Sequence, residues 1–486
     1  MNPAECTLSR EYESGTGTLA QFKLPVLSHY SYIFSNGSSA LLVDPGRELD
    51  AYQAYLEKHN LKLKAVFLTH SHADFVAGHL EAAAATGAPV LISRAAKAKY
   101  PHCPLHDGDR LKIGKAVIQF LATPGHTLDG VSALIEENGK ALCLLTGDTL
   151  FVGSVGRPDL MGGVISAAEL AELGYRSWQE KLATLPDELK FFPAHGAGSL
   201  CGANLKDEPF STIGEAKSEN PYWQARNRAE FVALVLTGLP EAPRYFSFDA
   251  AMNRKGPKAV KWNAKLKKAT RKDLEQAVIV DLRDGRRYAA GHLPGAINIG
   301  LEGRFENWVG IVVPPEAPLV LAADTEAELA EGVRRLHRIG YRARTIRCDK
   351  AAKAGIKLKK SGLVEPAELA KAMDGADCPL IVDVRNPGEF AAERIGTVVN
   401  LPLATLAAHT GKLNPAEPVV TICHSAYRSS LAVGILERAG FKKVATLAGG
   451  LEAWLEAKLP VTGDIAGGAP AKGSCKLKSR SQKHFG

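Results

Sequence analysis

Short apolar runs separated by polar turns fill the first part of the chain. Those rich in β-branched and aromatic residues predict strands, at Tyr30–Phe34, Ala40–Val43, Ala65–Leu68 and Pro89–Ile92. The run Val76–Ala85 is rich in Ala and Leu and predicts a helix. Residues 116–148 are mostly strand-like and precede a helical pattern over Ala167–Leu185 and a strand at Leu189–Phe192. Strand-rich blocks with helices outside them predict an αββα sandwich with its loops gathered at one edge.

The second half of the chain contains an internal repeat. Val278–Arg283 matches Leu380–Arg385 at an offset of 102 residues. In each copy, short apolar strands alternate with helical patterns, which predicts an α/β domain with a parallel sheet. The sequence therefore predicts five segments: 1–252 for the sandwich domain, 253–267 for a basic linker, 268–355 and 362–465 for the two repeat domains, and 466–486 for a basic flexible tail.

Charge changes this picture little. The formal charge of +8 comes from two segments. Arg254–Lys272 holds nine Lys or Arg residues and no acid, and Lys472–Lys483 holds five more. Neither segment shows a fold or an interleaved aromatic platform, so we expect solvated segments rather than a nucleic-acid partner. No run approaches the ~20 apolar residues of a membrane span, and residues 1–15 lack the apolar core of a signal peptide.

The eight cysteines are scattered and form no Cys-x-x-Cys pattern. This distribution fits a reducing compartment, and we predict a cytoplasmic protein whose thiols are available for chemistry.

Candidate metal ligands follow the predicted strands. Thr69-His70-Ser71-His72-Ala73-Asp74-Phe75 comes directly after the strand Ala65–Leu68. Further candidates stand in later loops, at His126, Asp148 and His195. Imidazole and carboxylate side chains on loops at the end of a sheet are typical of a metal site.

This series of loops resembles the metallo-β-lactamase superfamily over about residues 15–250. The hydrolytic branches of that superfamily usually carry His-x-His-x-Asp-His, whose last His helps to hold a second metal. Here that position is Phe75, which has no donor atom. A site of His70, His126 and Asp148 survives, and two imidazoles with one carboxylate form the facial triad of non-haem iron(II) oxygenases.

The resemblance narrows accordingly to the persulfide dioxygenases, and Gly156-Arg157-Pro158-Asp159 looks like the loop that follows the carboxylate ligand in that branch. It implies one Fe(2+) per chain, with zinc as the alternative. His72 and Asp74 are expected to orient ligands or to hydrogen-bond water, with His195 and Arg157 as further site residues. Cys201 could carry sulfur near the metal or could be a bystander thiol.

The two repeats resemble the rhodanese family, on Asp-x-Arg followed by Gly291-His292-Leu293-Pro294-Gly295-Ala296 in the first copy. In the second copy, Cys423 lies between a predicted strand, Val419–Ile422, and a helix that starts near Ser429. Backbone N–H groups and the positive end of a helix dipole favour a thiolate there, and Arg428 adds a cation. Four residues separate Cys423 from Arg428, the tighter loop that is associated with rhodanese sulfur transfer rather than with the related phosphatases.

The first copy lacks this chemistry, because its aligned positions are Ala323 and Glu328. No thiol is available, and a carboxylate replaces the cation. We therefore expect the first copy to be a structural or docking module.

Together these features predict a persulfide dioxygenase fused to a thiosulfate sulfurtransferase, acting on small thiol persulfides, dioxygen, sulfite and thiosulfate in sulfide oxidation or detoxification. Two alternatives stay open: a zinc thioester hydrolase similar to glyoxalase II, and a non-catalytic sulfane-sulfur carrier or regulator. The sequence does not fix the thiol, the direction of sulfur transfer or the oligomeric state, for which a homo-oligomer is one alternative.

Overall fold

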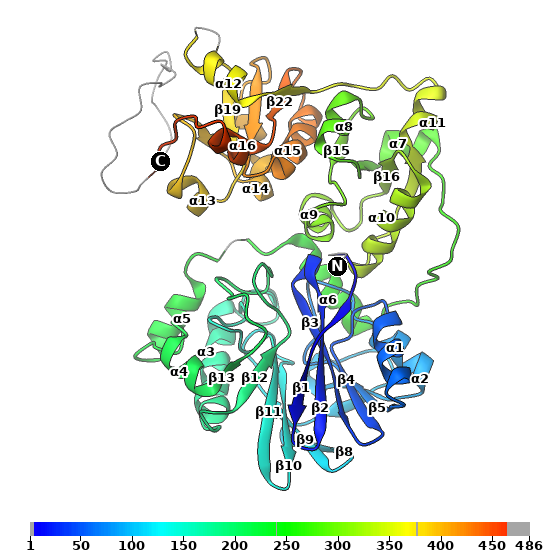
Figure 1. The fold of residues 1–486 in the computed structure, drawn as a ribbon, viewed down its shortest axis with the longest axis vertical. Coiled ribbons are helices and arrows are strands. Elements are labelled where there is room, and N and C mark those ends of the chain that lie inside the picture. Colours follow the sequence, from blue (N-terminus) through cyan, green and yellow to red (C-terminus); the bar gives the residue numbers. More distant parts are fainter. Residues whose placement is uncertain (1–3, 240, 376–377, 464–486) are drawn as a thin grey trace. The chain divides into compact units, whose positions relative to one another are not determined.

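The computed structural model describes residues 4–239, 241–375 and 378–463 (Figure 1). These residues form two compact units. The first contains the described residues up to Ala264 together with the segment Arg334–Tyr341, and the second contains the remainder. The predicted basic tail, 466–486, lies outside the described residues.

The first unit is built on two sheets. One has the strand order β1 (Thr7–Ser14), β2 (Gly17–Leu24), β3 (His29–Asn36), β4 (Ser39–Val43), β5 (Lys62–Phe67), β6 (Val90–Ser93) and β7 (Cys103–Leu105). The other has the order β13 (Ser211–Thr212), β12 (Lys190–Pro193), β11 (Lys140–Gly147), β10 (Val131–Glu137), β9 (Ala116–Ala122) and β8 (Arg110–Ile113).

Alternation along the strands of the first sheet builds two cores. In β4, Leu41 and Val43 point into a cluster that also contains Phe120 and Leu145 of the second sheet. Leu42, between them, points to the opposite face and packs with residues of the helices on that side. Because successive side chains of a strand face opposite ways, an apolar run such as this one is buried on both faces.

Helices cover both outer faces of the two sheets (Figure 1). On the outside of the first sheet lie α1 (Asp50–Lys58) and α2 (His79–Thr86). On the outside of the second lie α3 (Ala167–Ser177), a π-helical segment (Trp178–Leu182) and α4 (Ile213–Glu219). The unit also contains α5 (Arg228–Leu236) and α6 (Arg244–Lys255). This arrangement confirms the predicted αββα sandwich.

Two helix predictions differ from the structure in detail. The helix expected over Val76–Ala85 begins only at His79. The backbone N–H groups of Ala77 and Gly78 are bound instead by the Asn253 side chain and the Pro45 carbonyl, at 3.0 and 2.9 Å. The long helix expected over Ala167–Leu185 is α3 followed by a π-helical turn, whose wider winding the periodicity of the sequence does not reveal.

The second unit contains two parallel sheets, as predicted. The first copy has the order β15 (Ala296–Asn298), β14 (Val278–Asp281), β16 (Leu319–Ala323) and β17 (Arg344–Arg347). The second has β18 (Gly362–Val364), β22 (Val444–Leu447), β21 (Val419–Ile422), β19 (Leu380–Asp383) and β20 (Val399–Asn400). The domain boundaries drawn from the sequence stay a prediction.

Helices alternate with these strands. The first copy contains α7 (Arg271–Gln276), α8 (Gly285–Ala290), α9 (Phe305–Val312), α10 (Glu326–Arg338) and α11 (Cys348–Lys353). The second contains α12 (Pro366–Met373), α13 (Pro387–Ala392), α14 (Leu403–His409), α15 (Tyr427–Arg438) and α16 (Gly450–Glu456).

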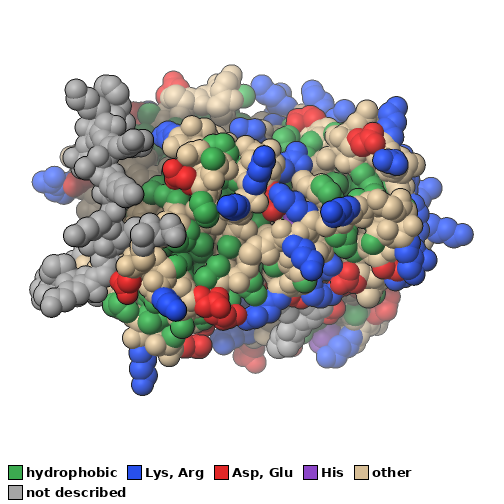
Figure 2. All heavy atoms as spheres, turned by 90° about the horizontal axis from the view of Figure 1, so that it is seen from above, with side chains coloured by type: hydrophobic (Ala, Val, Ile, Leu, Met, Phe, Trp, Pro, Cys, Tyr) green, Lys and Arg blue, Asp and Glu red, His purple; other side chains and the backbone are tan. Residues whose placement is uncertain are grey.

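Among the described helices, none combines the length and the apolar character that a membrane crossing requires. Figure 2 shows Lys and Arg side chains spread over one face of the protein, between hydrophobic and acidic side chains rather than in a continuous stripe. The absence of a nucleic-acid partner stays a prediction.

Candidate metal centre and sulfur-transfer loop

Three predicted ligands of the first unit come together in one buried cluster. The ligand atoms of His70, His126 and Asp148 all lie within 4.8 Å of one another. Asp148 Oδ2 is 3.8 Å from His70 Nε2 and 3.5 Å from His126 Nε2. All three side chains are almost completely inaccessible to solvent.

The fold brings these residues together because each follows the end of a strand. His70 comes after β5, His126 after β9 and Asp148 directly after β11. Gly147, the last residue of β11, has a φ of +54° and lies so close to Thr69 that a Cβ atom would be 2.5 Å from Thr69 Oγ1. A residue with a side chain would strain this turn and push the two loops apart.

In each ligand side chain, the polar atom that does not point into the cluster forms a hydrogen bond with a neighbouring residue. His70 Nδ1 lies 3.0 Å from Thr69 Oγ1, and His126 Nδ1 lies 2.9 Å from the Arg157 carbonyl oxygen, to which it donates. Asp148 Oδ1 pairs with His195 Nδ1 at 2.8 Å. Such contacts fix the ring orientation of metal ligands and direct the other nitrogen at the metal.

In each ligand side chain, the polar atom that points into the cluster has no hydrogen-bond partner. The atoms His70 Nε2, His126 Nε2 and Asp148 Oδ2 are buried and unsatisfied, although buried polar atoms are nearly always paired. These are the three atoms that converge. Two imidazole nitrogens and one carboxylate oxygen suit a non-haem metal, so the residues present fit a metal ion.

The protonation states suit metal binding as well. Burial is the largest influence on both histidines and lowers the pKa of His70 to about 3 and the pKa of His126 below its ordinary value. Burial alone would raise the pKa of Asp148, but the nearby imidazoles, that of His195 foremost, outweigh it and hold this pKa well below its usual range. Neutral imidazoles and an ionised carboxylate are the forms that coordinate metals.

A second group of potential ligands lies beside the first. Asp74, His195 and Cys201 are buried and also have ligand atoms within 4.8 Å of one another. His195 Nε2 is 2.9 Å from Asp74 Oδ2, so His195 lies between two carboxylates, Asp74 and Asp148. Burial raises the pKa of the Cys201 thiol well above its usual value, which favours the protonated thiol.

The other predicted residues of the motif pair elsewhere. His72 Nε2 is 2.9 Å from Asp44 Oδ1. The Phe75 ring packs against the rings of His72 and His29, with centroids 4.4 and 4.2 Å apart. The Arg157 side chain forms two 2.7 Å contacts with Asp159. Arg157 contacts the cluster through its backbone carbonyl, which accepts the hydrogen bond from His126 Nδ1.

Sequence reasoning missed the residues that brace the metal loop from elsewhere in the chain. Asp44 accepts hydrogen bonds from both the backbone and the hydroxyl of Thr69, at 2.8 Å. Asn253, at the C-terminal end of α6, donates to the carbonyls of His72 and Phe75 at 2.7 and 2.8 Å and accepts from Ala77. Asn253 is the first residue of the predicted linker, where the basic composition gave no sign of it.

Replacing Asn253 with alanine should loosen the metal loop. The change removes three buried hydrogen bonds at roughly 1 kcal/mol each and leaves two carbonyls and one N–H without a partner. It should lower the free energy of unfolding by about 3 kcal/mol. We expect faster loss of the bound metal to a chelator and a lower urea midpoint for the variant. Ser247→Ala, an exposed change on the same helix, should behave like the wild type, and equal metal retention in both variants would contradict the bracing role.

In the second unit, Cys423 follows β21 and precedes α15, as the sequence predicts for a nucleophile loop. The Ser429 backbone N–H donates to Cys423 Sγ at 3.3 Å, and the cysteine is buried. Ala426 has a φ of +68°, a strained value for a residue with a side chain. Gly450 lies directly against the loop. A Cβ atom there would be 2.4 and 2.6 Å from the His424 and Cys423 carbonyl oxygens, so a side chain at this position would displace the loop.

Arg428 does not stand alone beside the thiol. Its guanidinium forms a bidentate pair with Glu389 of α13, with contacts of 2.7 and 2.6 Å. The pair fixes the position of Arg428 and neutralises part of its charge. Sequence reasoning missed Glu389, whose place after Asp-x-Arg-Asn-Pro-Gly is the only signal.

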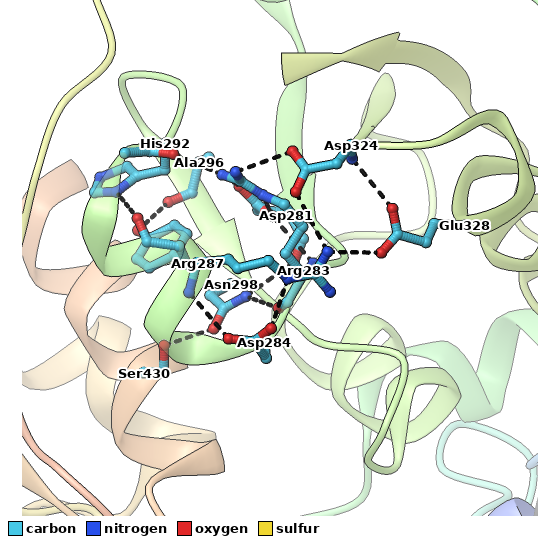
Figure 3. A network of polar contacts seen from close by, with 12 residues as sticks. Asp281, Arg283, Asp284, Arg287, His292, Ala296, Asn298, Asp324, Glu328 and Ser430 are labelled. Carbon is cyan, nitrogen blue, oxygen red and sulfur yellow. Dashed lines mark hydrogen bonds and ion pairs between the residues drawn. The ribbon is translucent and has the colours of Figure 1, made fainter. Parts of the chain in front are cut away.

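The repeated Asp-x-Arg motif is a structural element in both copies. In the first copy, Arg283 binds Asp281 (Figure 3) and the Gly291 carbonyl, both at 2.7 Å. In the second copy, Arg385 binds Asp383 and the Glu393 carbonyl, both at 2.6 Å. The buried arginine joins the end of the first strand to the end of the following helix. This explains why the motif is retained in the copy that has no nucleophile.

The copies differ in the polarity of one ion pair. In the first copy, Arg287 of α8 pairs with Glu328 of α10 at 3.0 Å (Figure 3). These positions align with Glu389 and Arg428 of the second copy, where the charges are exchanged. Ala323, at the Cys423 position, is buried at the end of β16.

Comparison with known proteins agrees with this architecture. The metallo-beta-lactamase superfamily model matches residues 24–195, and the rhodanese-like domain model matches residues 263–348 and 365–457. A crystal structure of a metallo-beta-lactamase from Staphylococcus aureus subsp. aureus COL is 27% identical, with a TM-score of 0.62, and the match covers 68% of this chain and 98% of that one.

Fold and site thus define a metallo-β-lactamase domain followed by two rhodanese-like domains. Mitochondrial persulfide dioxygenase ETHE1 of Bos taurus is 32% identical over 206 residues, 41% of this chain and 77% of the relative. The Homo sapiens protein is 30% identical over 194 residues, 39% of this chain and 72% of the relative. The chain belongs to the persulfide dioxygenase–rhodanese fusion family, which confirms the resemblance found in the sequence.

Proposed function

We propose that the first unit is an iron(II) persulfide dioxygenase and that the second unit transfers sulfane sulfur through Cys423. The observation that carries the first half is the convergence of three buried, unsatisfied atoms, His70 Nε2, His126 Nε2 and Asp148 Oδ2. The ETHE1 relatives and the rhodanese-like domains support a role in sulfur metabolism.

In this proposal His70, His126 and Asp148 hold the iron. When bound, the iron supplies the redox chemistry by which dioxygen oxidises the terminal sulfur of a persulfide. The overall change balances as R–S–SH, O₂ and H₂O giving R–SH, sulfite and two protons. Thr69, the Arg157 carbonyl and His195 keep the three ligands oriented, and burial of the cluster excludes bulk water from them.

The sulfur-transfer half uses Cys423 as the nucleophile. The Cys423 thiolate attacks the outer sulfur of thiosulfate, the S–S bond breaks, and sulfite leaves with its electron pair. A thiolate acceptor then takes the same sulfur from the Cys423 persulfide, which restores the thiolate. The Ser429 N–H and the start of α15 stabilise the negative sulfur during both steps.

Metal analysis and oxygen uptake test the first half together. We expect about one iron per chain after purification under reducing conditions, and oxygen uptake when a preformed small persulfide is added to the iron-loaded protein. Tightly bound zinc with rapid thioester hydrolysis would favour a hydrolase similar to glyoxalase II. Metal-free protein that stores sulfur without consuming oxygen would favour a carrier. One iron per chain and a cytoplasmic location stay predictions.

A further inference from the structure

The first unit contains one segment that comes from the first repeat copy. Residues Arg334–Tyr341, which are the C-terminal end of α10 and the three residues after it, group with the described residues up to Ala264. The helix therefore begins in the second unit and ends in the first. The position of this segment in the sequence gives no sign that it belongs to the unit that holds the metal cluster.

The way in which α10 ends leaves its last carbonyl available for a contact outside the helix. The Tyr341 N–H binds the Leu336 carbonyl at 3.0 Å, and Gly340 between them has a φ of +69°. This is a Schellman motif, which pairs carbonyls of the last turn but not the final one. The final carbonyl of α10, that of Arg338, accepts instead from the Val76 N–H at 2.6 Å.

The Val76 N–H is the first of three consecutive donors between the metal loop, residues 69–75, and α2. The next two bind the Asn253 side chain and the Pro45 carbonyl. Each donor thus has an acceptor from a different part of the chain, and the acceptor for Val76 comes from the first repeat copy. Val76 directly follows the loop that carries His70, so the contact with Arg338 fixes one end of that loop.

Charged side chains anchor the end of α10 in the first unit. Arg338, which is only 2% exposed, donates from Nε to Glu48 Oε2 at 2.7 Å and from Nη2 to the Ala4 carbonyl at 2.5 Å. Arg334, one turn earlier, pairs with the same Glu48 carboxylate. A hydrogen-bonded ion pair that is almost buried holds both partners in one geometry, and removing either partner leaves the other charge uncompensated.

The end of α10 also packs against α6, the helix that supplies Asn253. A Cβ atom on Gly340 would lie 2.7 Å from Met252 Cε, so the backbone of this turn lies directly against the α6 side chain that precedes Asn253. Arg338 and Asn253 therefore bind neighbouring residues at the end of the metal loop from two segments that pack against each other.

We infer that the end of α10, Arg334–Tyr341, positions the metal loop, with Arg338 as the positioning residue. The Glu48 ion pair holds Arg338, the Arg338 carbonyl holds Val76, and the loop before Val76 presents His70 to the metal. The first repeat copy, which has no nucleophile, thereby contributes a support to the metal centre. The inference goes beyond the proposed function, because it applies to whichever metal the three ligands bind.

Cobalt(II) in the full-length protein tests this inference without relying on activity, because its visible ligand-field absorption reports how the ligands are arranged. We expect Arg338→Ala to shift that absorption and to speed metal loss to a chelator by about tenfold, the lower end of the range for residues that support metal ligands.

Two milder variants carry the test if Arg338→Ala does not fold. Glu48→Gln keeps the shape of the side chain but removes its charge, and it should change both measurements in the same direction as Arg338→Ala. Arg338→Lys keeps the charge but cannot reproduce the forked contact with Glu48 and Ala4, so its values should fall between those of Arg338→Ala and the wild type.

Two controls separate positioning from a general loss of stability. Arg226→Ala removes an exposed ion pair with Glu230 in the same unit and should change neither measurement. Ile213→Ala opens a cavity at a fully buried core position of that unit. It should lower the urea midpoint and leave the cobalt absorption unchanged.

Unchanged absorption and release rate in every folded Arg338 and Glu48 variant would overturn the inference. A shift in Ile213→Ala as large as that in the Arg338 variants would also overturn it, because the effect would then be one of stability alone, and so would wild-type protein that binds no cobalt. Failure of the proposed function looks different: iron-loaded wild-type protein that consumes no oxygen would refute the dioxygenase and leave the cobalt result standing.

Discussion

Replacing His126 with alanine should remove the bound iron and abolish oxygen uptake together. The change deletes one of three converging donors and leaves His70 Nε2 and Asp148 Oδ2 facing a cavity. Loss of a mere supporting contact around a metal commonly costs 10–100-fold in affinity, so loss of a ligand should cost at least about 100-fold. Iron content by elemental analysis and oxygen uptake with a small persulfide measure the two losses.

The matched control is His106→Ala, an exposed histidine of the same unit that should change neither quantity. The His126 variant should also keep its thiosulfate-dependent sulfur transfer, because Cys423 lies in the other compact unit. A variant that retained its full iron content would contradict the assignment of His126 as a ligand.

Replacing Cys423 with serine should abolish sulfur transfer from thiosulfate and leave oxygen uptake largely intact. A hydroxyl has nearly the shape of a thiol but cannot form a persulfide, so the loss should be complete within the sensitivity of the assay. The iron chemistry needs no thiol from the protein as long as a small persulfide diffuses to the metal. Sulfite release from thiosulfate and oxygen uptake with a preformed persulfide measure the two activities.

Cys103→Ser, which changes an exposed free thiol, is the control and should preserve both activities. The competing mechanism is an obligatory relay, in which Cys423 hands its sulfur to the iron centre. Under a relay, Cys423→Ser would stop oxygen uptake as completely as the loss of His126, and that coincidence would defeat the model of two independent sites.

The sandwich could be predicted because the apolar residues of its strands show in the sequence alone that the strands are buried. Leu41, Leu42 and Val43 are apolar on both faces of β4, so the local pattern already requires layers on both sides. The start of α2 could not be predicted, because the N–H of Ala77 is bound by Asn253, which lies far along the chain. Local propensity favours a helix there, and a tertiary contact overrides it.

The same distinction applies to the candidate sites. His70, His126 and Asp148 stand in short motifs after strands, and their proximity follows from strand ends meeting at one edge. Asn253 stands in no motif, and Glu389 is marked only by its place after Asp-x-Arg-Asn-Pro-Gly, because each acts through a contact that only the folded chain creates. The functional roles assigned to all these residues stay predictions until the variants are measured.

The exchanged ion pair limits how a nucleophile could be restored in the first copy. Glu328→Arg alone would set two guanidiniums against each other at Arg287, while Arg287→Glu alone would crowd a new carboxylate among Asp284, Asp324 and Glu328. Recovering a nucleophile at Ala323 therefore needs three coordinated substitutions, and either charge reversal made alone is electrostatically unfavourable. Returning the first copy to the charge arrangement of the second therefore requires Arg287 and Glu328 to be changed together, and a substitution at Ala323 alone does not restore it.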